Sequence, residues 1–128
     1  MRLLLDTHLL IWAAKNLPRL SAAARAVIGA PENERVFSVC SLWEVAIKAG
    51  LGRQDFAIDV TALRRGLLAN GYQELAVLGP HALFTSRLPP IHKDPFDRLL
   101  VAQALVEGLT LVTSDAVVAT YSETIIRV

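Results

Sequence analysis

The chain has 128 residues, of which 53% are hydrophobic and 20% are charged, and its formal net charge is +1. This length suits one domain with a substantial core, and the composition excludes a disordered chain, a coiled coil and a generally basic nucleic-acid coat. The single cysteine, Cys40, excludes an internal disulfide, and we expect it to be a small core residue in a reducing compartment.

The apolar run at residues 3–14 does not have the pattern of a secretory signal, because Asp6 and His8 interrupt it. No segment approaches the roughly 18 continuous apolar residues that a membrane span needs. We therefore expect a soluble, cytoplasmic protein without a membrane partner.

Short apolar strands alternate with helical segments along the chain. Residues 2–5 form an apolar run typical of a strand covered on both faces, and a helix is predicted over residues 7–15 because Pro18 stops it. The later elements are predicted, in chain order, as a helix from the Ser21 cap to Ile28, a strand at 36–39, a helix opened by residues 41–44 and closed by Gly50 and Gly52, a helix at 59–68, a strand at 75–78, a short helix at 80–87, a helix at 95–107, a strand at 109–112, a short helix at 116–121 and a strand at 124–128. This alternation predicts an α/β fold, a single parallel-sheet α/β/α sandwich forming one domain over residues 1–128.

The helix predicted over residues 95–107 has the clearest boundaries. Asp94 is suited to cap it, Pro95 fits its first position and Gly108 ends it. Asp97 in its first turn begins a mostly apolar face, where a charged side chain needs a partner. The alternative is that Asp97 is only a first-turn acid, stabilised by the positive end of the helix dipole.

Four acidic residues are predicted to meet at one edge of the sheet. Asp6 follows the first strand, Glu44 lies in the first turn of the helix after the second strand, Asp97 begins the helix described above, and Asp115 follows the fourth strand. Parallel sheets bind ligands beyond the carboxyl ends of their strands, so all four side chains are expected at that edge.

Each of these acids also has a local interpretation. Asp6 and Asp115 are suited to cap the helices that follow them, whereas Glu44 completes a Ser-x-x-Glu capping box with Ser41 and lies four residues before Lys48. Carboxylates that converge at a water-poor edge repel one another, however, and a divalent cation relieves this repulsion most simply. Oxygen ligands of this kind favour Mg²⁺ or Mn²⁺, whereas the three histidines and one cysteine lack the spacing of a zinc site.

A carboxylate cluster that holds one or two hard cations is suited to the hydrolysis of phosphodiester bonds by a water nucleophile. The sequence has no Gly-rich phosphate loop, dinucleotide fingerprint or nucleophile elbow, and no separate protein general base is identifiable. A receiver-like, Mg²⁺-binding signalling module is an alternative, but it resembles a pattern with a lysine after a late strand, where this chain has residues 113–115, Thr-Ser-Asp. A haloacid dehalogenase-like phosphatase requires an Asp-x-Asp, where residues 6–8 are Asp-Thr-His.

Four segments resemble the motifs of PIN-domain proteins, and most closely those of the VapC-like toxins of type II toxin–antitoxin systems: LLDTH at 4–8, SLWE at 41–44, HKDPFDRLLVAQA at 92–104 and LVTSD at 111–115. The resemblance implies a PIN-like fold and a metal-dependent ribonuclease. It matches Asp6, Glu44, Asp97 and Asp115 to the family's catalytic, metal-binding quartet, Thr7, Thr113 and Ser114 to polar positions beside the quartet, and Asp94 to an additional acid that either ligates through water or only caps its helix.

The resemblance also implies three kinds of partner: an RNA substrate, a cognate antitoxin and a second copy of the toxin in a homodimer. A PIN-like scaffold that binds RNA without cleaving it is a further alternative. The candidates for RNA contact are His8, Lys48, His92, Lys93 and Arg98, each of which has solvation or ion pairing as its local explanation. The large aromatic side chains Trp12, Trp43 and Phe56 are expected to pack in the core rather than to anchor an interface.

Overall fold

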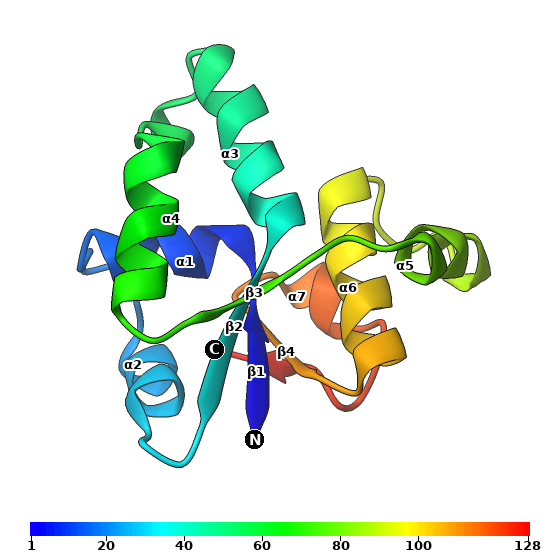
Figure 1. The fold of residues 1–128 in the computed structure, drawn as a ribbon. Coiled ribbons are helices and arrows are strands. Elements are labelled where there is room, and N and C mark those ends of the chain that lie inside the picture. Colours follow the sequence, from blue (N-terminus) through cyan, green and yellow to red (C-terminus); the bar gives the residue numbers. More distant parts are fainter.

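The structure is a computed structural model that describes residues 1–128, and its centre is one sheet of five parallel strands (Figure 1). The strand order is β3-β2-β1-β4-β5, so the first strand lies in the middle. The strands are β1 (Arg2–Leu5), β2 (Glu34–Ser38), β3 (Gln73–Leu75), β4 (Thr110–Thr113) and β5 (Ile126–Arg127). The predicted α/β architecture is confirmed.

Helices cover both faces of the sheet, with α1, α2 and α4 on one side and α5, α6 and α7 on the other (Figure 1). They are α1 (Thr7–Ala14), α2 (Ala22–Gly29), α3 (Val39–Gly50), α4 (Val60–Ala69), α5 (Gly79–Phe84), α6 (Pro95–Glu107) and α7 (Ala116–Ala119), with single 3₁₀ turns at Gln54–Phe56 and Thr85–Arg87. Helix α3 extends beyond the sheet at the end where β1 and β2 finish. No helix has the length and apolar character that crossing a bilayer requires.

The apolar run of β1 separates two hydrophobic clusters. Leu3 and Leu5 face the cluster under α1, α2 and α4, whereas Leu4 faces the cluster under α6 and α7. All three side chains are completely buried. Since successive side chains of a strand point to opposite faces, a continuous apolar run is what a central strand with two covered faces needs.

Helix α6 has the predicted boundaries because its end signals are local. One carboxylate oxygen of Asp94 accepts the backbone N–H groups of Phe96 at 2.8 Å and Asp97 at 3.3 Å. Gly108 adopts the left-handed conformation with φ of 67°, which a residue with a side chain rarely adopts. Asp94 is therefore the cap of α6, as predicted.

The predicted start of α3 was wrong. The helix begins at Val39, and Ser38 is its cap, since the Ser38 hydroxyl accepts the backbone N–H of Cys40 at 3.0 Å. Ser41 therefore lies inside the first turn and cannot form the capping box with Glu44 that the sequence suggested. The predicted ion pair between Glu44 and Lys48 is present, with Lys48 Nζ 2.5 Å from Glu44 Oε2.

Two predicted strands were too long or displaced. Strand β3 was predicted over residues 75–78, but it ends at Leu75, which pairs with Ser38, the last residue of β2. Strand β5 was predicted over residues 124–128 but spans only Ile126–Arg127, with Arg127 paired to Thr113 at the end of β4. An apolar segment that runs past the end of its neighbour has no ladder partner and leaves the sheet.

Candidate metal centre

Asp6 is held rigidly where β1 ends and α1 begins. Its Oδ1 accepts the backbone N–H of Leu9 at 2.9 Å, and its Oδ2 accepts the hydroxyl of Thr113 at 2.6 Å. The side chain is buried, and this burial raises its pKa above the usual range although the hydrogen bonds from Thr113 and Leu9 lower it. The predicted cap at Asp6 is therefore confirmed, and it coexists with a place at the carboxyl edge of the sheet.

Glu44 lies on α3 and is likewise buried. Its Oε1 is 2.5 Å from the hydroxyl of Thr7, and Lys48 donates to its Oε2. The same ammonium group lies 3.3 Å from Asp94 Oδ2. Burial lowers the pKa of Lys48, but the bonds to Glu44 and Asp94 outweigh this and raise it, so Lys48 remains a cation that joins α3 to the start of α6.

His92 lies between the two remaining acids. Its Nε2 is 3.5 Å from Asp97 Oδ2 and 3.3 Å from Asp115 Oδ2, and one potential ligand atom from each of the three residues lies within 4.8 Å of the others. The backbone N–H of Asp94 donates to His92 Nδ1 at 3.0 Å, so the ring hydrogen of a neutral His92 is on Nε2 and points at the two carboxylates. Asp115 also caps α7 through the N–H groups of Val117 and Val118.

Shared partners join acids from distant parts of the chain: Lys48 Nζ contacts Glu44 and Asp94, and His92 Nε2 contacts Asp97 and Asp115. Burial raises the pKa of Asp97, and the negative charges of Asp94, Glu44 and Asp6 raise it further, to about 7, although His92 opposes them. A like charge shifts a pKa only when it is near. The direction of this shift agrees with the contacts through Lys48 and His92. We call Asp6, Glu44, Asp94, Asp97, Asp115 and His92 the acidic cluster.

The acidic cluster suits a hard divalent cation. Its donors are carboxylate oxygens with one imidazole, which Mg²⁺ and Mn²⁺ accept, and it contains no thiolate because burial raises the pKa of Cys40 to about 12. A cation beside Asp97 would reverse the repulsion that raises the pKa of Asp97. One potential ligand atom each from His92, Asp97 and Asp115 lies within 4.8 Å of the others, and this group does not include Asp6 or Glu44.

Of the polar residues predicted beside the quartet, Thr7 and Thr113 act through their side chains and Ser114 through its backbone. The Thr7 and Thr113 side chains are buried against Glu44 and Asp6, which fixes the orientation of those carboxylates. Ser114 contributes through its backbone, which hydrogen-bonds to the carboxylate of Asp6 and lowers the Asp6 pKa.

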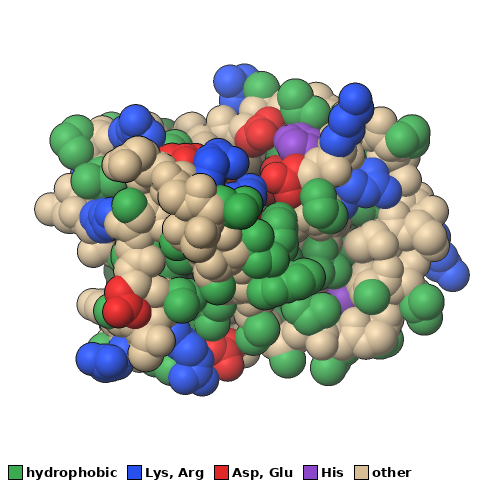
Figure 2. Space-filling view, turned by 90° about the horizontal axis from the view of Figure 1, so that it is seen from above, with side chains coloured by type: hydrophobic (Ala, Val, Ile, Leu, Met, Phe, Trp, Pro, Cys, Tyr) green, Lys and Arg blue, Asp and Glu red, His purple; other side chains and the backbone are tan.

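Some of the predicted RNA-contacting side chains are exposed, and others are bonded within the protein. Lys93 is exposed next to the acidic cluster, and His8 is paired with Asp55 at 3.2 Å. Arg98 instead donates to the backbone carbonyls of Thr85 and Pro89 and to the hydroxyl of Tyr121. Its guanidinium therefore fixes the segment before α6 and is not free to bind RNA. Figure 2 shows acidic, histidine and basic side chains gathered beside a broad hydrophobic patch on this face.

Two features of the site were not predicted. Tyr121 accepts the backbone N–H of His92 at 2.8 Å as well as a bond from Arg98, and no sequence pattern links these positions. The position of His92 between two acids was also missed, because it depends on the fold of the segment before α6.

The sequence model of the PIN domain matches residues 3–123. The chain belongs to the PIN domain family. PIN domains are generally nucleases, and they depend on divalent metal ions. A search of curated proteins gives no significant match.

Solved structures of toxin–antitoxin complexes share the fold of this PIN domain. VapBC2 from Rickettsia felis, bound to a DNA fragment from its promoter, superposes with a TM-score of 0.69 at 16% identity, covering 100% of this chain and 98% of that one. VapBC-1 from nontypeable Haemophilus influenzae gives 0.65 at 21% identity, covering 100% and 97%. A toxin–antitoxin complex from Klebsiella pneumoniae gives 0.63 at 20% identity, covering 96% and 94%.

Proposed function

We propose that this PIN domain is a Mg²⁺- or Mn²⁺-dependent endoribonuclease that acts as the toxin of a type II toxin–antitoxin pair. The observation that carries the proposal is the convergence of carboxylates from β1, α3, α6 and the end of β4. The fold likeness to VapBC complexes favours the toxin role over that of a receiver-like module.

The chain's own residues would position the reaction. Asp6, Glu44, Asp97 and Asp115 would hold the cation, which would supply Lewis acidity for the hydrolysis of a phosphodiester bond by water. Thr7 and Thr113 fix the carboxylates that they contact. Lys93, and Lys48 beside Glu44, provide the positive charge that attracts an RNA backbone in a protein whose net charge is only +1.

The products of cleavage test this chemistry. Attack of water on phosphorus, with departure of the 3′ oxygen, leaves a 5′-phosphate and a 3′-hydroxyl. We expect these ends by mass spectrometry of an RNA digested with Mg²⁺, and no cleavage with EDTA. A 2′,3′-cyclic phosphate product would contradict the proposal, and intact RNA that nevertheless binds the protein would indicate the non-catalytic alternative.

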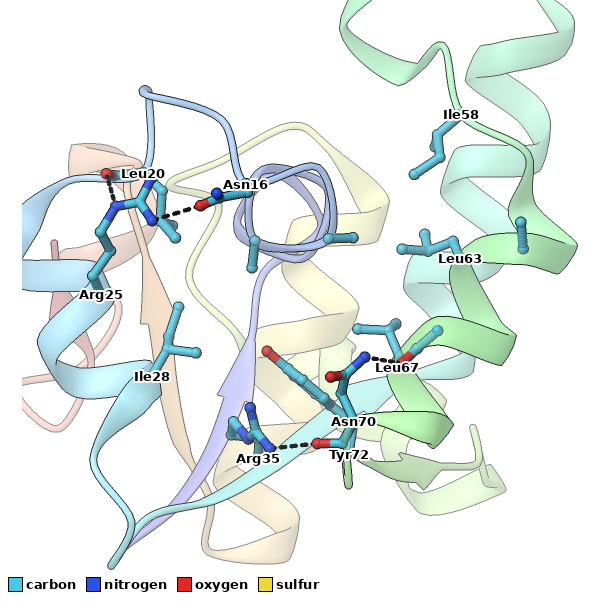
Figure 3. A pocket seen from close by; sticks show the side chains of 14 residues that line it. Asn16, Leu20, Arg25, Ile28, Arg35, Ile58, Leu63, Leu67, Asn70 and Tyr72 are labelled. Atoms are coloured by element: carbon cyan, nitrogen blue, oxygen red, sulfur yellow. Dashed lines mark hydrogen bonds between the residues drawn. The ribbon is translucent and has the colours of Figure 1, made fainter.

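A cavity of about 530 Å³ between α1, α2 and α4 supports the antitoxin as a protein partner (Figure 3). Leu20, Ile28, Leu63 and Leu67 give it an apolar wall, and Arg25 stands at its edge with its guanidinium bonded to Asn16 at 2.8 Å. This combination fits an antitoxin segment that carries apolar side chains and a carboxylate. The Rickettsia and Haemophilus relatives were solved as toxin–antitoxin complexes.

A stripe on α3 supports the homodimer. Trp43 and Ile47 on α3, and Leu51 at its C-cap, are spaced four residues apart and are 60%, 38% and 76% exposed. Trp43 therefore does not lie in the core, although its ring packs edge-on against Phe96 with centroids 5.4 Å apart, whereas Phe56 is completely buried. A row of large apolar side chains on one face is typical of a self-complementary interface.

Leu51→Glu is therefore expected to weaken the dimer by about tenfold or more, because it places a charge in the proposed apolar contact. Light scattering over a concentration series measures this change. Leu83→Glu is the matched control, since Leu83 is 75% exposed on α5 and lies outside the stripe. A monomeric wild type, or equal effects of the two substitutions, would contradict this interface.

A further inference from the structure

The amide of Gln103 joins three parts of the fold inside the protein. Its Oε1 accepts the hydroxyl of Ser38 at 2.5 Å, and its Nε2 donates to the carbonyl of Ala76 at 3.2 Å and lies 3.3 Å from His81 Nδ1. Gln103, Ser38 and His81 are at most 1% exposed. Helix α6 is thereby tied to the end of β2, to the segment after β3 and to α5.

The neighbours of Gln103 allow only one orientation of its amide. His81 Nδ1 accepts the backbone N–H of Leu78 at 3.0 Å, so Nδ1 is an acceptor, and the carbonyl of Ala76 is another. A flipped amide would place its oxygen against two acceptors. Its oxygen must therefore face Ser38, whose hydroxyl donates to it and at the same time caps α3.

The two residues of the Ser38–Gln103 hydrogen bond are each six residues from a proposed metal ligand. Glu44 is six residues after Ser38 along α3, and Asp97 is six residues before Gln103 along α6. Six residues of α-helix rise about 9 Å, so a tilt of about 5° between the helices at this point would move either acid by about 0.8 Å. A displacement of about 1 Å is enough to lower catalysis roughly a hundredfold.

We propose that Gln103 is a positioning residue that holds the start of α3 against α6 and thereby sets the separation of Glu44 and Asp97 that a divalent cation requires. Gln103 touches neither the acidic cluster nor substrate, and it acts through Ser38 and the two helices. The inference rests on the proposed nuclease function and deepens it.

Gln103→Met tests the proposal because methionine has a similar length and no amide. We expect calorimetric titration of RNA-free protein with Mn²⁺ to give an affinity about 10- to 100-fold below that of the wild type, the range for outer partners of metal ligands. We expect kcat to fall by a similar factor while KM for RNA stays within about twofold.

A double-mutant cycle identifies the bond responsible. Ser38→Ala is expected to weaken Mn²⁺ binding less in the Gln103→Met protein than in the wild type. The bond to Gln103 is already absent in the Gln103→Met protein, whereas the loss of the α3 cap is the same in both. Additive losses in Mn²⁺ affinity would overturn the proposed path through Ser38. Ser38→Ala also serves alone if the methionine variant does not fold, because it removes the same bond from its other end.

Leu63→Ala is the control for a purely structural effect. Leu63 is buried in the cluster on the other face of the sheet, so this substitution lowers the melting temperature without moving α3 against α6. Wild-type Mn²⁺ affinity in Gln103→Met, or equal affinity losses in Gln103→Met and Leu63→Ala, would overturn the positioning role and leave the nuclease proposal intact. A wild type that takes up no Mn²⁺ would overturn both.

Discussion

Asp97→Asn is expected to abolish RNA cleavage while leaving the protein folded. Asparagine keeps the shape of the side chain but removes the negative charge, and Asp97 is a proposed metal ligand at the centre of the acidic cluster. The rate should fall by more than the roughly 10- to 100-fold that outer partners of a metal site contribute. Its backbone N–H bond to the Asp94 cap is unaffected, so α6 should begin at the same residue.

The assay measures cleavage of a labelled RNA with Mg²⁺, alongside circular dichroism of each variant. Asp6→Asn should show the same loss of activity. Asp59→Asn is the matched control, because Asp59 is exposed, caps α4 and lies outside the acidic cluster, and asparagine is also a good cap. Cleavage at the wild-type rate by either site variant would disprove the assignment of the quartet.

Metal-free protein is expected to lose stability as the pH rises from about 4 to about 7. The pKa of Asp97 is about 7 in the folded protein and close to 3.8 in the unfolded chain, so the folded state keeps a proton in this window that the unfolded state has lost. The unfolding free energy therefore falls with rising pH and levels off above 7. Each pKa unit corresponds to about 1.4 kcal/mol, so the total is a few kcal/mol at most, reduced because solvent reaches part of the carboxyl group.

Thermal unfolding in EDTA between pH 4.5 and 8 measures this slope. Asp97→Asn should reduce this slope, the remainder coming from Asp6, whose pKa is also raised, and it should be more stable than the wild type at pH 8, since the repelled charge is absent. Mg²⁺ at about 100 times its dissociation constant should stabilise the wild type at pH 8 by about 2.7 kcal/mol. The lowered pKa of Asp115 contributes stability that is fully present above the unfolded value of 3.8, so it stays constant over this window and does not mask the effect. Stability that rises through this window would contradict the proposed repulsion.

Helix ends that are set by capping residues could be predicted from the sequence, because a cap and the helix it ends are neighbours in the chain. Asp94, Pro95 and Gly108 fixed both ends of α6, and the rule for parallel sheets brought Asp6 and Asp97 to one edge. The end of β3 was not predictable in this way, because it depends on where β2 stops and not on the apolar run of residues 75–78.

The details of the site were less accessible to sequence reasoning. Both Ser38 and Ser41 are suited by residue type to cap α3. The cap is Ser38 because β2 ends there, and the sequence does not show where β2 ends. The contacts of His92 with Asp97 and Asp115, and of Tyr121 with Arg98, depend on how the segment before α6 folds back on α7. Sequence spacing carries no information on such contacts.

The hydrogen bond from Thr113 to Asp6 joins residues 107 positions apart, across the pairing of β1 with β4. A chain emerging from the ribosome that has not yet delivered β4 therefore lacks the hydroxyl that orients Asp6, one side of its central strand and the carboxylate of Asp115. The proposed nuclease site therefore cannot assemble until β4 and Asp115 have been synthesised.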